Sequence, residues 1–194
     1  MTKPTLFLAS SSPRRRELMQ QVGLEFSLIT AHVDETPLPG EQPAAYVERL
    51  ARAKAGAGLN GVPPGWGLVV AADTTVSVDG EVLGKPGSEA EALAMWQRLS
   101  GRDHQVLTGL AVADHDRVAV AVVTTVVSFR TITEAEMLAY WASGEPADKA
   151  GGYAIQGRGA LFVSCIAGSY SNVVGLPLAE LGTLLESFDY SLWA

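Results

Sequence analysis

Cysteine is nearly absent from this sequence of 194 residues, in which Cys165 is the single one. One cysteine cannot form an internal disulfide, so the chain lacks the covalent framework that small secreted domains use. The expected compartment is therefore the reducing cytoplasm. Cys165 lies in an apolar run, and we expect a small buried residue there rather than a reactive thiol.

Positive charge is also scarce, with 14 lysines and arginines against 21 aspartates and glutamates and a formal net charge of −7. Proteins that bind DNA or RNA need clustered basic side chains along the phosphate backbone, so we do not expect a nucleic acid partner. A small anionic ligand needs only one local basic cluster, and residues 14–16 are consecutive arginines.

Long hydrophobic runs are missing as well. The longest apolar stretch, residues 118–127, contains two threonines and is too short for a membrane span. The apolar part of the N-terminus is too short for a secretory signal peptide. These absences predict a protein that has no membrane partner.

What the chain does contain is a globular composition, with 47% hydrophobic and 18% charged residues. Hydrophobic periodicity and helix-capping residues predict an α/β domain with a mixed central sheet and flanking helices. The strands are expected at residues 5–9, 26–30, 68–72 with a continuation over 74–78, 81–83, 106–113, 118–130 and 160–166. The helices are expected at residues 13–21, 44–59, 88–99, 133–142 and 178–188.

The first candidate site is the serine-rich turn between the first strand and the first helix, Ser10-Ser11-Ser12-Pro13-Arg14-Arg15. A helix N-terminus presents unpaired N–H groups and a positive dipole end, which suits phosphate. Serine hydroxyls add donors, and arginines add charge-assisted hydrogen bonds. An ordinary capped helix with solvated arginines explains the local pattern equally well.

Asp73 follows the buried run 68–72 and is expected at the carboxyl end of a strand, where α/β sheets place ligands. Its carboxylate could bind a metal or act as a general base for water, and an aspartate that only bonds a neighbouring turn is the alternative. Glu35, Lys85 and Gln156 lie in loops rich in Gly or Pro, where they could serve as metal ligand, phosphate contact and base contact. Solvated loop residues are the alternative for all three.

Taken together, these segments resemble the Maf family of nucleotide pyrophosphatases over residues 6–177, in order. Each motif is weak alone, whereas the ordered set is highly specific. The matching segments are Leu8-Ala9-Ser10, Ser12-Pro13-Arg14-Arg15, Asp34-Glu35-Thr36, Ala72-Asp73-Thr74, Gly84-Lys85-Pro86, Ser100-Gly101-Arg102 with His104 and Thr108-Gly109, Gly144-Glu145-Pro146, Asp148-Lys149-Ala150-Gly151, Ile155-Gln156-Gly157 and Asn172 to Pro177. Ser11 is a departure, because a glycine is common in the family at this position.

The resemblance implies a single Maf-like domain over residues 1–194, with two lobes around a nucleotide cleft as in inosine-triphosphate pyrophosphatases. It implies cleavage of a nucleoside triphosphate between the α- and β-phosphates, with Mg²⁺ or Mn²⁺ as cofactor. Asp73 would be the general base, and Glu35 and Asp73 would hold the metal. The other implied substrate and specificity positions are Ser10, Arg14, Arg15, Lys54, Thr74, Lys85 and Gln156.

Substrate choice within the family depends on the late loop. One subfamily prefers dTTP, UTP and related modified pyrimidine nucleotides, and the other prefers 7-methyl-GTP and has a glutamate at the position of Gln156. The resemblance thus points to the pyrimidine type. A 7-methyl-GTP pyrophosphatase and a nucleotide-binding regulator of cell division without catalysis are the alternatives. Members often pair, so a homodimer is also expected.

Overall fold

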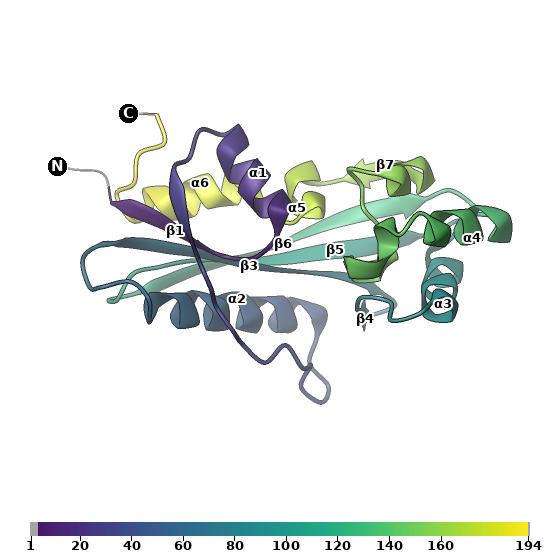
Figure 1. Ribbon diagram of the computed structural model, residues 1–194, viewed down its shortest axis with the longest axis horizontal. Coiled ribbons are helices and arrows are strands. Elements are labelled where there is room, and N and C mark those ends of the chain that lie inside the picture. The colour runs from purple at the N-terminus through teal and green to yellow at the C-terminus, as the bar shows by residue number, and fades with distance from the viewer. Residues whose placement is uncertain (1–3, 194) are drawn as a thin grey trace.

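A computed structural model describes residues 4–193 of the chain, and these residues form one seven-stranded mixed sheet (Figure 1). The strand order is β2-β1-β3-β5-β6-β7, and β4 pairs with β3. β1 is parallel to β2 and β3, while the remaining pairs are antiparallel. The strands are β1 (Thr5–Ala9), β2 (Phe26–Ile29), β3 (Gly67–Val78), β4 (Glu81–Leu83), β5 (Asp103–Ala113), β6 (Val118–Phe129) and β7 (Val163–Ala167).

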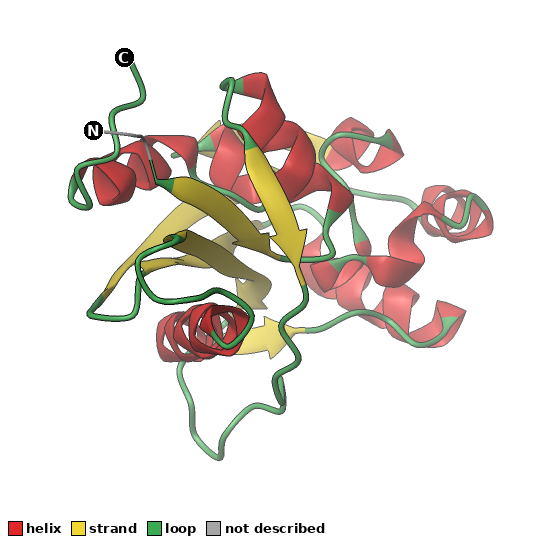
Figure 2. Cartoon of the chain, turned by 60° about the vertical axis from the view of Figure 1, so that its left-hand side comes forward, coloured by secondary structure: helices red, strands yellow, loops and turns green. Residues whose placement is uncertain are grey.

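Helices cover both faces of the sheet (Figure 2). The α-helices are α1 (Pro13–Gln21), α2 (Pro43–Leu59), α3 (Glu89–Leu99), α4 (Glu134–Ala142), α5 (Tyr170–Val174) and α6 (Leu178–Glu186). Short 3-10 helices occur at η1 (Glu145–Asp148), η2 (Ala150–Gly152) and η3 (Arg158–Phe162). Side-chain caps fix the starts of α1, α3 and α4 at Ser12, Ser88 and Thr133. The predicted α/β class and mixed sheet with flanking helices are therefore confirmed.

Alternate residues of β3 build two different hydrophobic layers, as the pleat of a strand requires. Val69 and Ala71 pack toward Ala51 and Ala55 of α2 on one face. Their neighbours Val70 and Ala72 pack on the other face with residues of α1 and α6. Both layers form the core of a first lobe, which contains β1, the N-terminal half of β3 and the C-terminal half of β5.

A second lobe forms at the other end of the same long strands. Its core includes Val76 of β3, Val106 of β5, Trp96 of α3 and Tyr140 of α4. The two lobes share the long continuous strands β3, β5 and β6 (Figure 1). Their relative position is therefore set by continuous strands.

Polar side chains separate the two hydrophobic cores. Thr74 of β3 and Thr108 of β5 lie opposite each other, and their hydroxyl oxygens are 2.9 Å apart. Asn172 of α5 is fully buried and donates from Nδ2 to the Val106 carbonyl oxygen and to the Thr125 hydroxyl. Buried polar groups need such partners, so this seam is a built feature of the fold.

The C-terminal third departs from the sequence-based expectation. The strand expected over 160–166 is instead η3 followed by β7, and α5 was not expected. Cys165 was expected to be buried, but it is exposed on β7, which lies at the edge of the sheet. Residues 1–3, which are part of the segment considered as a signal peptide, and Ala194 lie outside the described residues.

Among residues 4–193, none of the helices is both long enough and apolar enough to cross a membrane.

His104 gives the second lobe a predicted sensitivity to acid. Its ring is buried between Phe129 and Tyr153, and burial lowers its pKa to about 4. The unfolded chain binds the proton near pH 6.5, so folding stability should fall as the pH drops from about 6.5 to about 4, by roughly 3 kcal/mol in total. Urea unfolding across this range tests the slope.

The matched comparison is His104→Gln, which retains a polar partner for the Tyr153 hydroxyl, 2.8 Å from Nε2, and cannot take up the proton. We expect a flatter pH profile for this variant than for His32→Gln. Equal slopes in the two variants would contradict the assignment to His104.

Candidate active site

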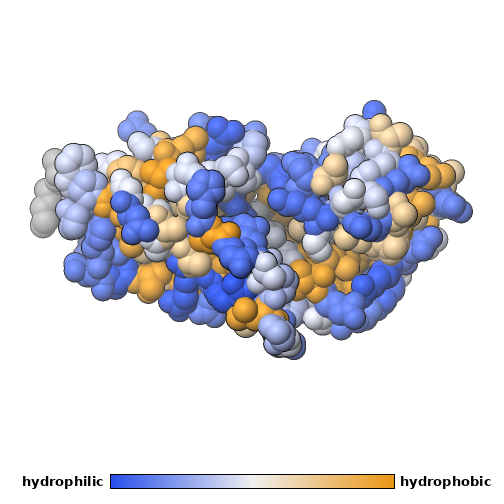
Figure 3. Space-filling view, turned by 60° about the horizontal axis from the view of Figure 1, so that its bottom comes forward, coloured by the Kyte–Doolittle hydropathy of each residue, from blue (hydrophilic) through white to orange (hydrophobic). Residues whose placement is uncertain are grey.

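A cleft of about 570 Å³ lies between the two lobes, at the polar seam. Figure 3 shows the corresponding hollow, which is bordered by hydrophilic side chains. Every candidate site residue from the sequence lines this one cleft, namely Ser10, Arg14, Arg15, Glu35, Lys54, Asp73, Thr74, Lys85 and Gln156. Residues that are up to 146 positions apart along the chain are thereby brought together.

The turn before α1 presents donors to the cleft. Ser12 caps the helix by accepting from the Arg15 N–H. The Ser10 hydroxyl oxygen accepts from the Ser12 N–H and from Arg15 Nη1, both at 3.2 Å. Since this oxygen already accepts two hydrogen bonds, its own proton is available to donate to a ligand.

Arg15 is fixed by three partners from three parts of the chain. Nε donates to the Gly175 carbonyl oxygen at 2.8 Å, Nη1 donates to Ser10, and Nη2 donates to the Thr74 hydroxyl at 3.1 Å. Burial lowers the pKa of Arg15, and the charge of Asp73 opposes that shift. Arg15 therefore joins α1 to β3 and to the residue that ends α5, and places a fixed charge beside the cleft.

Arg14 differs from its neighbour. Within residues 4–193 it has neither a hydrogen bond nor an ion pair to another side chain, although it lines the cleft. A guanidinium in this condition can turn toward an anion without breaking an existing contact. The two consecutive arginines thus have different surroundings, one fixed and one available.

Asp73 does not end a strand, which corrects the expectation from the sequence. β3 continues without a break to Val78, and Asp73 lies in its middle, opposite Gly109 of β5. A strand buried on both faces allows the apolar run and its continuation to form one element. The carboxylate, in a residue only 7% exposed, faces the cleft from the centre of the sheet.

Lys54 of α2 connects the two acidic residues of the site. Its ammonium lies 2.7 Å from Asp73 Oδ1 and 2.6 Å from Glu35 Oε1. Burial raises the pKa of Glu35, but the hydrogen bond from Lys54 and the charges of Lys54, Lys85 and Arg15 lower it below its ordinary value. Both carboxylates thus converge on one cationic position.

Tyr46, which sequence analysis did not single out, lies in this acidic part of the cleft. Its hydroxyl donates to the Glu35 backbone carbonyl oxygen at 2.9 Å, which ties the loop before α2 to that helix. Burial, together with the negative charges of Asp73 and Glu35, raises its pKa to about 12.

The opposite wall comes from the second lobe. Lys85 follows β4, and Gln156 lies in a turn after η2, and both are exposed in the cleft. Lys149 also lines the cleft, beside Asp148, with which it forms an ion pair. Sequence analysis quoted Lys149 within a family motif but gave it no role, although a lysine beside glycines in the late loop was a usable signal for an anion contact.

The acidic pair fits a magnesium or manganese ion in part. No group of three or more His, Cys, Asp or Glu side chains within residues 4–193 could hold a metal alone. Mg²⁺ characteristically takes one or two carboxylates and completes its shell with substrate phosphates and water. Glu35 and Asp73, which already share one cation in Lys54, supply that donor set.

Comparisons with known proteins identify relatives over nearly the whole chain. The chain is similar to proteins named dTTP/UTP pyrophosphatase from Dechloromonas aromatica (47% identity, covering 95% of this chain and 98% of that one), Acinetobacter baylyi (50%, covering 92% and 97%) and Pseudoalteromonas translucida (50%, covering 94% and 96%). Among solved structures it is similar to the Staphylococcus aureus Ham1 protein, with a TM-score of 0.48 and 18% identity over 64% of this chain and 71% of that one. The family model described as Maf-like protein matches residues 5–188, and the chain therefore belongs to the Maf family.

Proposed function

We propose that this protein hydrolyses dTTP and UTP to the nucleoside monophosphate and pyrophosphate. The observation that carries the proposal is the gathering of basic side chains and two carboxylates around one cleft of substrate size. Relatives that share 47–50% of its residues over nearly the whole chain bear the name dTTP/UTP pyrophosphatase. The proposal places the reaction in one Maf-like domain over residues 1–194.

The basic residues fit a polyphosphate. A triphosphate carries about four negative charges and needs concentrated compensation. Arg14 and Lys85 line the cleft without an ion pair to another described residue, so their charges are available to phosphate oxygens. The Ser10 hydroxyl and the fixed Arg15 add donors at the N-terminus of α1.

Glu35 and Asp73 would hold Mg²⁺ or Mn²⁺. When bound, this cation would neutralise charge that develops on the phosphate oxygens during cleavage. Lys54 gives way to the cation or moves toward the phosphates, because its ammonium lies between the same two carboxylates.

Asp73 acts in this proposal as the general base. Its carboxylate takes a proton from a water molecule that attacks the α-phosphorus in line. The bond from the α-phosphorus to the oxygen it shares with the β-phosphorus then breaks, and pyrophosphate leaves with that oxygen. Before the reaction, the Lys54 ammonium lies 2.7 Å from Asp73 Oδ1.

Gln156 supports the pyrimidine preference. Its amide offers a donor and an acceptor, which match the N–H and carbonyl of the imide edge of thymine and uracil. A glutamate there only accepts and suits the donor edge of guanine. Arg14 and Thr74, which the family resemblance connects with base choice, line the same cleft. The Thr74 hydroxyl is held by Arg15 and Thr108.

A nucleotide panel tests the function. With Mg²⁺ present, we expect pyrophosphate and monophosphate from dTTP and UTP in preference to CTP, GTP and 7-methyl-GTP. Preference for 7-methyl-GTP would move the chain to the other subfamily. Tight binding of all nucleotides without pyrophosphate release would indicate a regulator without catalysis. Sedimentation velocity tests the homodimer that we also propose.

Replacing Gln156 by glutamate tests the assignment of the base contact. The change removes the amide donor and adds charge, so we expect kcat/KM for dTTP and UTP to fall about tenfold or more. Gln105→Glu, outside the cleft, is the matched control. Unchanged rates across the panel for Gln156→Glu would refute a base-reading role.

A further inference from the structure

Two residues outside the cleft hold the turn that carries Gln156. The Tyr140 hydroxyl donates to Glu145 Oε1 at 2.6 Å and accepts the Ala154 N–H at 3.1 Å. The Glu145 carboxylate also accepts the N–H groups of Arg158 at 2.9 Å and Gly159 at 3.1 Å. This Glu145–Tyr140 anchor therefore bonds both ends of the segment 154–159.

The segment is itself a tight turn. The Gly157 N–H donates to the Ala154 carbonyl oxygen at 3.2 Å, so Gln156 lies in the central part of the turn. Gly157 and Gly159 lie against the anchor. A Cβ at Gly157 would overlap the Glu145 carboxylate, and one at Gly159 would come within 2.8 Å of the Tyr140 hydroxyl. The turn thus fits closely on the anchor at two positions that have no side chain.

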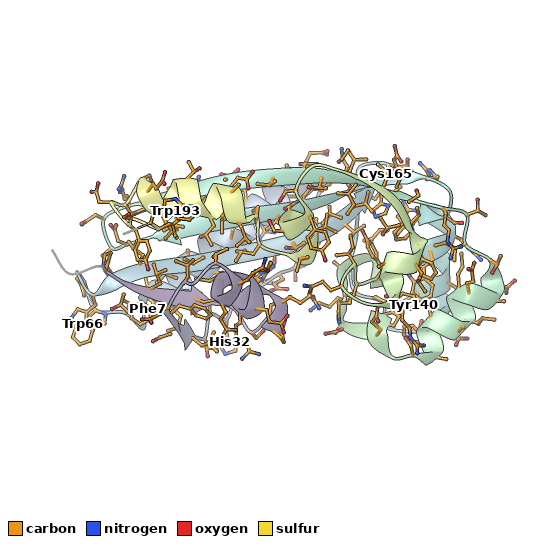
Figure 4. The ribbon with its side chains drawn as sticks, turned by 90° about the horizontal axis from the view of Figure 1, so that it is seen from above. Phe7, His32, Trp66, Tyr140, Cys165 and Trp193 are labelled. Carbon is orange, nitrogen blue, oxygen red and sulfur yellow. The ribbon has the colours of Figure 1, made fainter. Side chains whose placement is uncertain are left out.

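The Tyr140 ring fixes the anchor in the core of the second lobe. Tyr140 is 4% exposed, and its ring contacts Trp96 and Phe162 at centroid distances of 5.2 and 5.1 Å, within the second lobe (Figure 4). Burial and the hydrogen bond to Glu145 raise the pKa of Tyr140, so the hydroxyl keeps its proton and remains a donor. Burial alone would raise the pKa of Glu145, but bonds from Tyr140 and the two amides lower it.

Gln156 depends on this support. Its side chain is exposed in the cleft and has no hydrogen bond to another residue within 4–193. The position of Gln156 and the direction in which its side chain leaves the backbone are therefore set by the turn, with no other described side chain holding the amide. The residues assigned to the phosphates lie in other segments, namely the turn before α1, α1, α2, β3 and the loop after β4.

We propose that Tyr140 and Glu145 are positioning residues for base selection, acting through the turn that presents Gln156. The proposal rests on the proposed function and adds the device that fixes its specificity. It predicts that loosening the anchor weakens discrimination among nucleobases and leaves the phosphate chemistry intact. A role limited to general stability would instead reduce turnover of every substrate by the same factor.

The first experiment compares dTTP with 2-deoxyribose 5-triphosphate, which has the same polyphosphate and no base. Tyr140→Phe removes two hydrogen bonds, so we expect kcat/KM for dTTP to fall about five- to tenfold, mainly through KM. The rate on the base-free triphosphate should stay unchanged. Tyr170→Phe is the control, because Tyr170 is half exposed and lies outside the cleft. Equal losses on both substrates overturn the proposal.

The second experiment is a double-mutant cycle with Gln156→Ala. If Tyr140 acts through Gln156, then Tyr140→Phe should not change the ratio of dTTP to base-free turnover any further once Gln156 is alanine. If the two substitutions instead lower this ratio independently, so that their factors multiply, the proposal is wrong. Glu145→Gln repeats the cycle with the shape retained, so the test survives if Tyr140→Phe folds poorly. A wild-type protein that releases no pyrophosphate from dTTP would refute the proposed function instead.

Discussion

Asp73→Asn should reduce pyrophosphate release from dTTP by roughly 100- to 10,000-fold, the range associated with loss of a general base. The amide has the shape of the carboxylate and cannot accept the proton from the attacking water. The fold should survive, because Lys54 retains Glu35 as a partner at 2.6 Å and the amide oxygen can still accept from the ammonium.

Two measurements separate lost chemistry from lost structure. Circular dichroism and thermal unfolding report whether Asp73→Asn is folded, and binding of a non-hydrolysable dTTP analogue reports whether the cleft is intact. Asp116→Asn, in the exposed turn between β5 and β6, is the matched control and should keep wild-type turnover. A folded Asp73→Asn protein with wild-type turnover would falsify the role assigned to Asp73.

The sequence was informative where local physics decides the structure. Capping serines and threonine marked the starts of α1, α3 and α4, because a cap is recognised within four consecutive residues. The serine-rich turn before α1 was likewise identified from the sequence as the start of a helix, and the structure places it in the cleft. Local patterns could not show that Arg15 is held by Thr74 and Gly175, since those contacts depend on how distant elements pack.

Asp73 shows why other features of the site could not be predicted from the sequence. An apolar run followed by a carboxylate predicts that the strand ends there. In the structure β3 continues, because the carboxylate faces a cleft and has Lys54 as its partner. Lys54 itself was identified only through the family resemblance, as its helix pattern is that of a polar surface position. The Glu145–Tyr140 anchor likewise could not be inferred from spacing, since it joins α4 to a turn by side-chain geometry.

Gly109→Ala should be the most destabilising single-methyl change near the site. Gly109 lies opposite Asp73, and a Cβ there would overlap the backbone carbonyl oxygen of Val47 in α2. Backbone cannot rotate away as a side chain can, so α2 must move. Overpacking of a core costs about 1–3 kcal/mol, and we expect a loss of unfolding free energy at or above the upper end of that range.

The same displacement should reach the residues to which we assign the chemistry. Val47 and Lys54 are on one helix, so a shift of α2 from β5 carries the ammonium away from Asp73 and Glu35. Gly109→Ala should therefore lose turnover on dTTP and on the base-free triphosphate alike, unlike Tyr140→Phe. Gly56→Ala is the control on the same helix: its Cβ meets nothing within 4 Å, and the change should be neutral or stabilise by up to about 1 kcal/mol. Urea unfolding tests the packing, because equal stabilities of the two variants would contradict a close fit of α2 on Gly109. A destabilised Gly109→Ala protein with unchanged turnover would mean that this packing does not position Lys54.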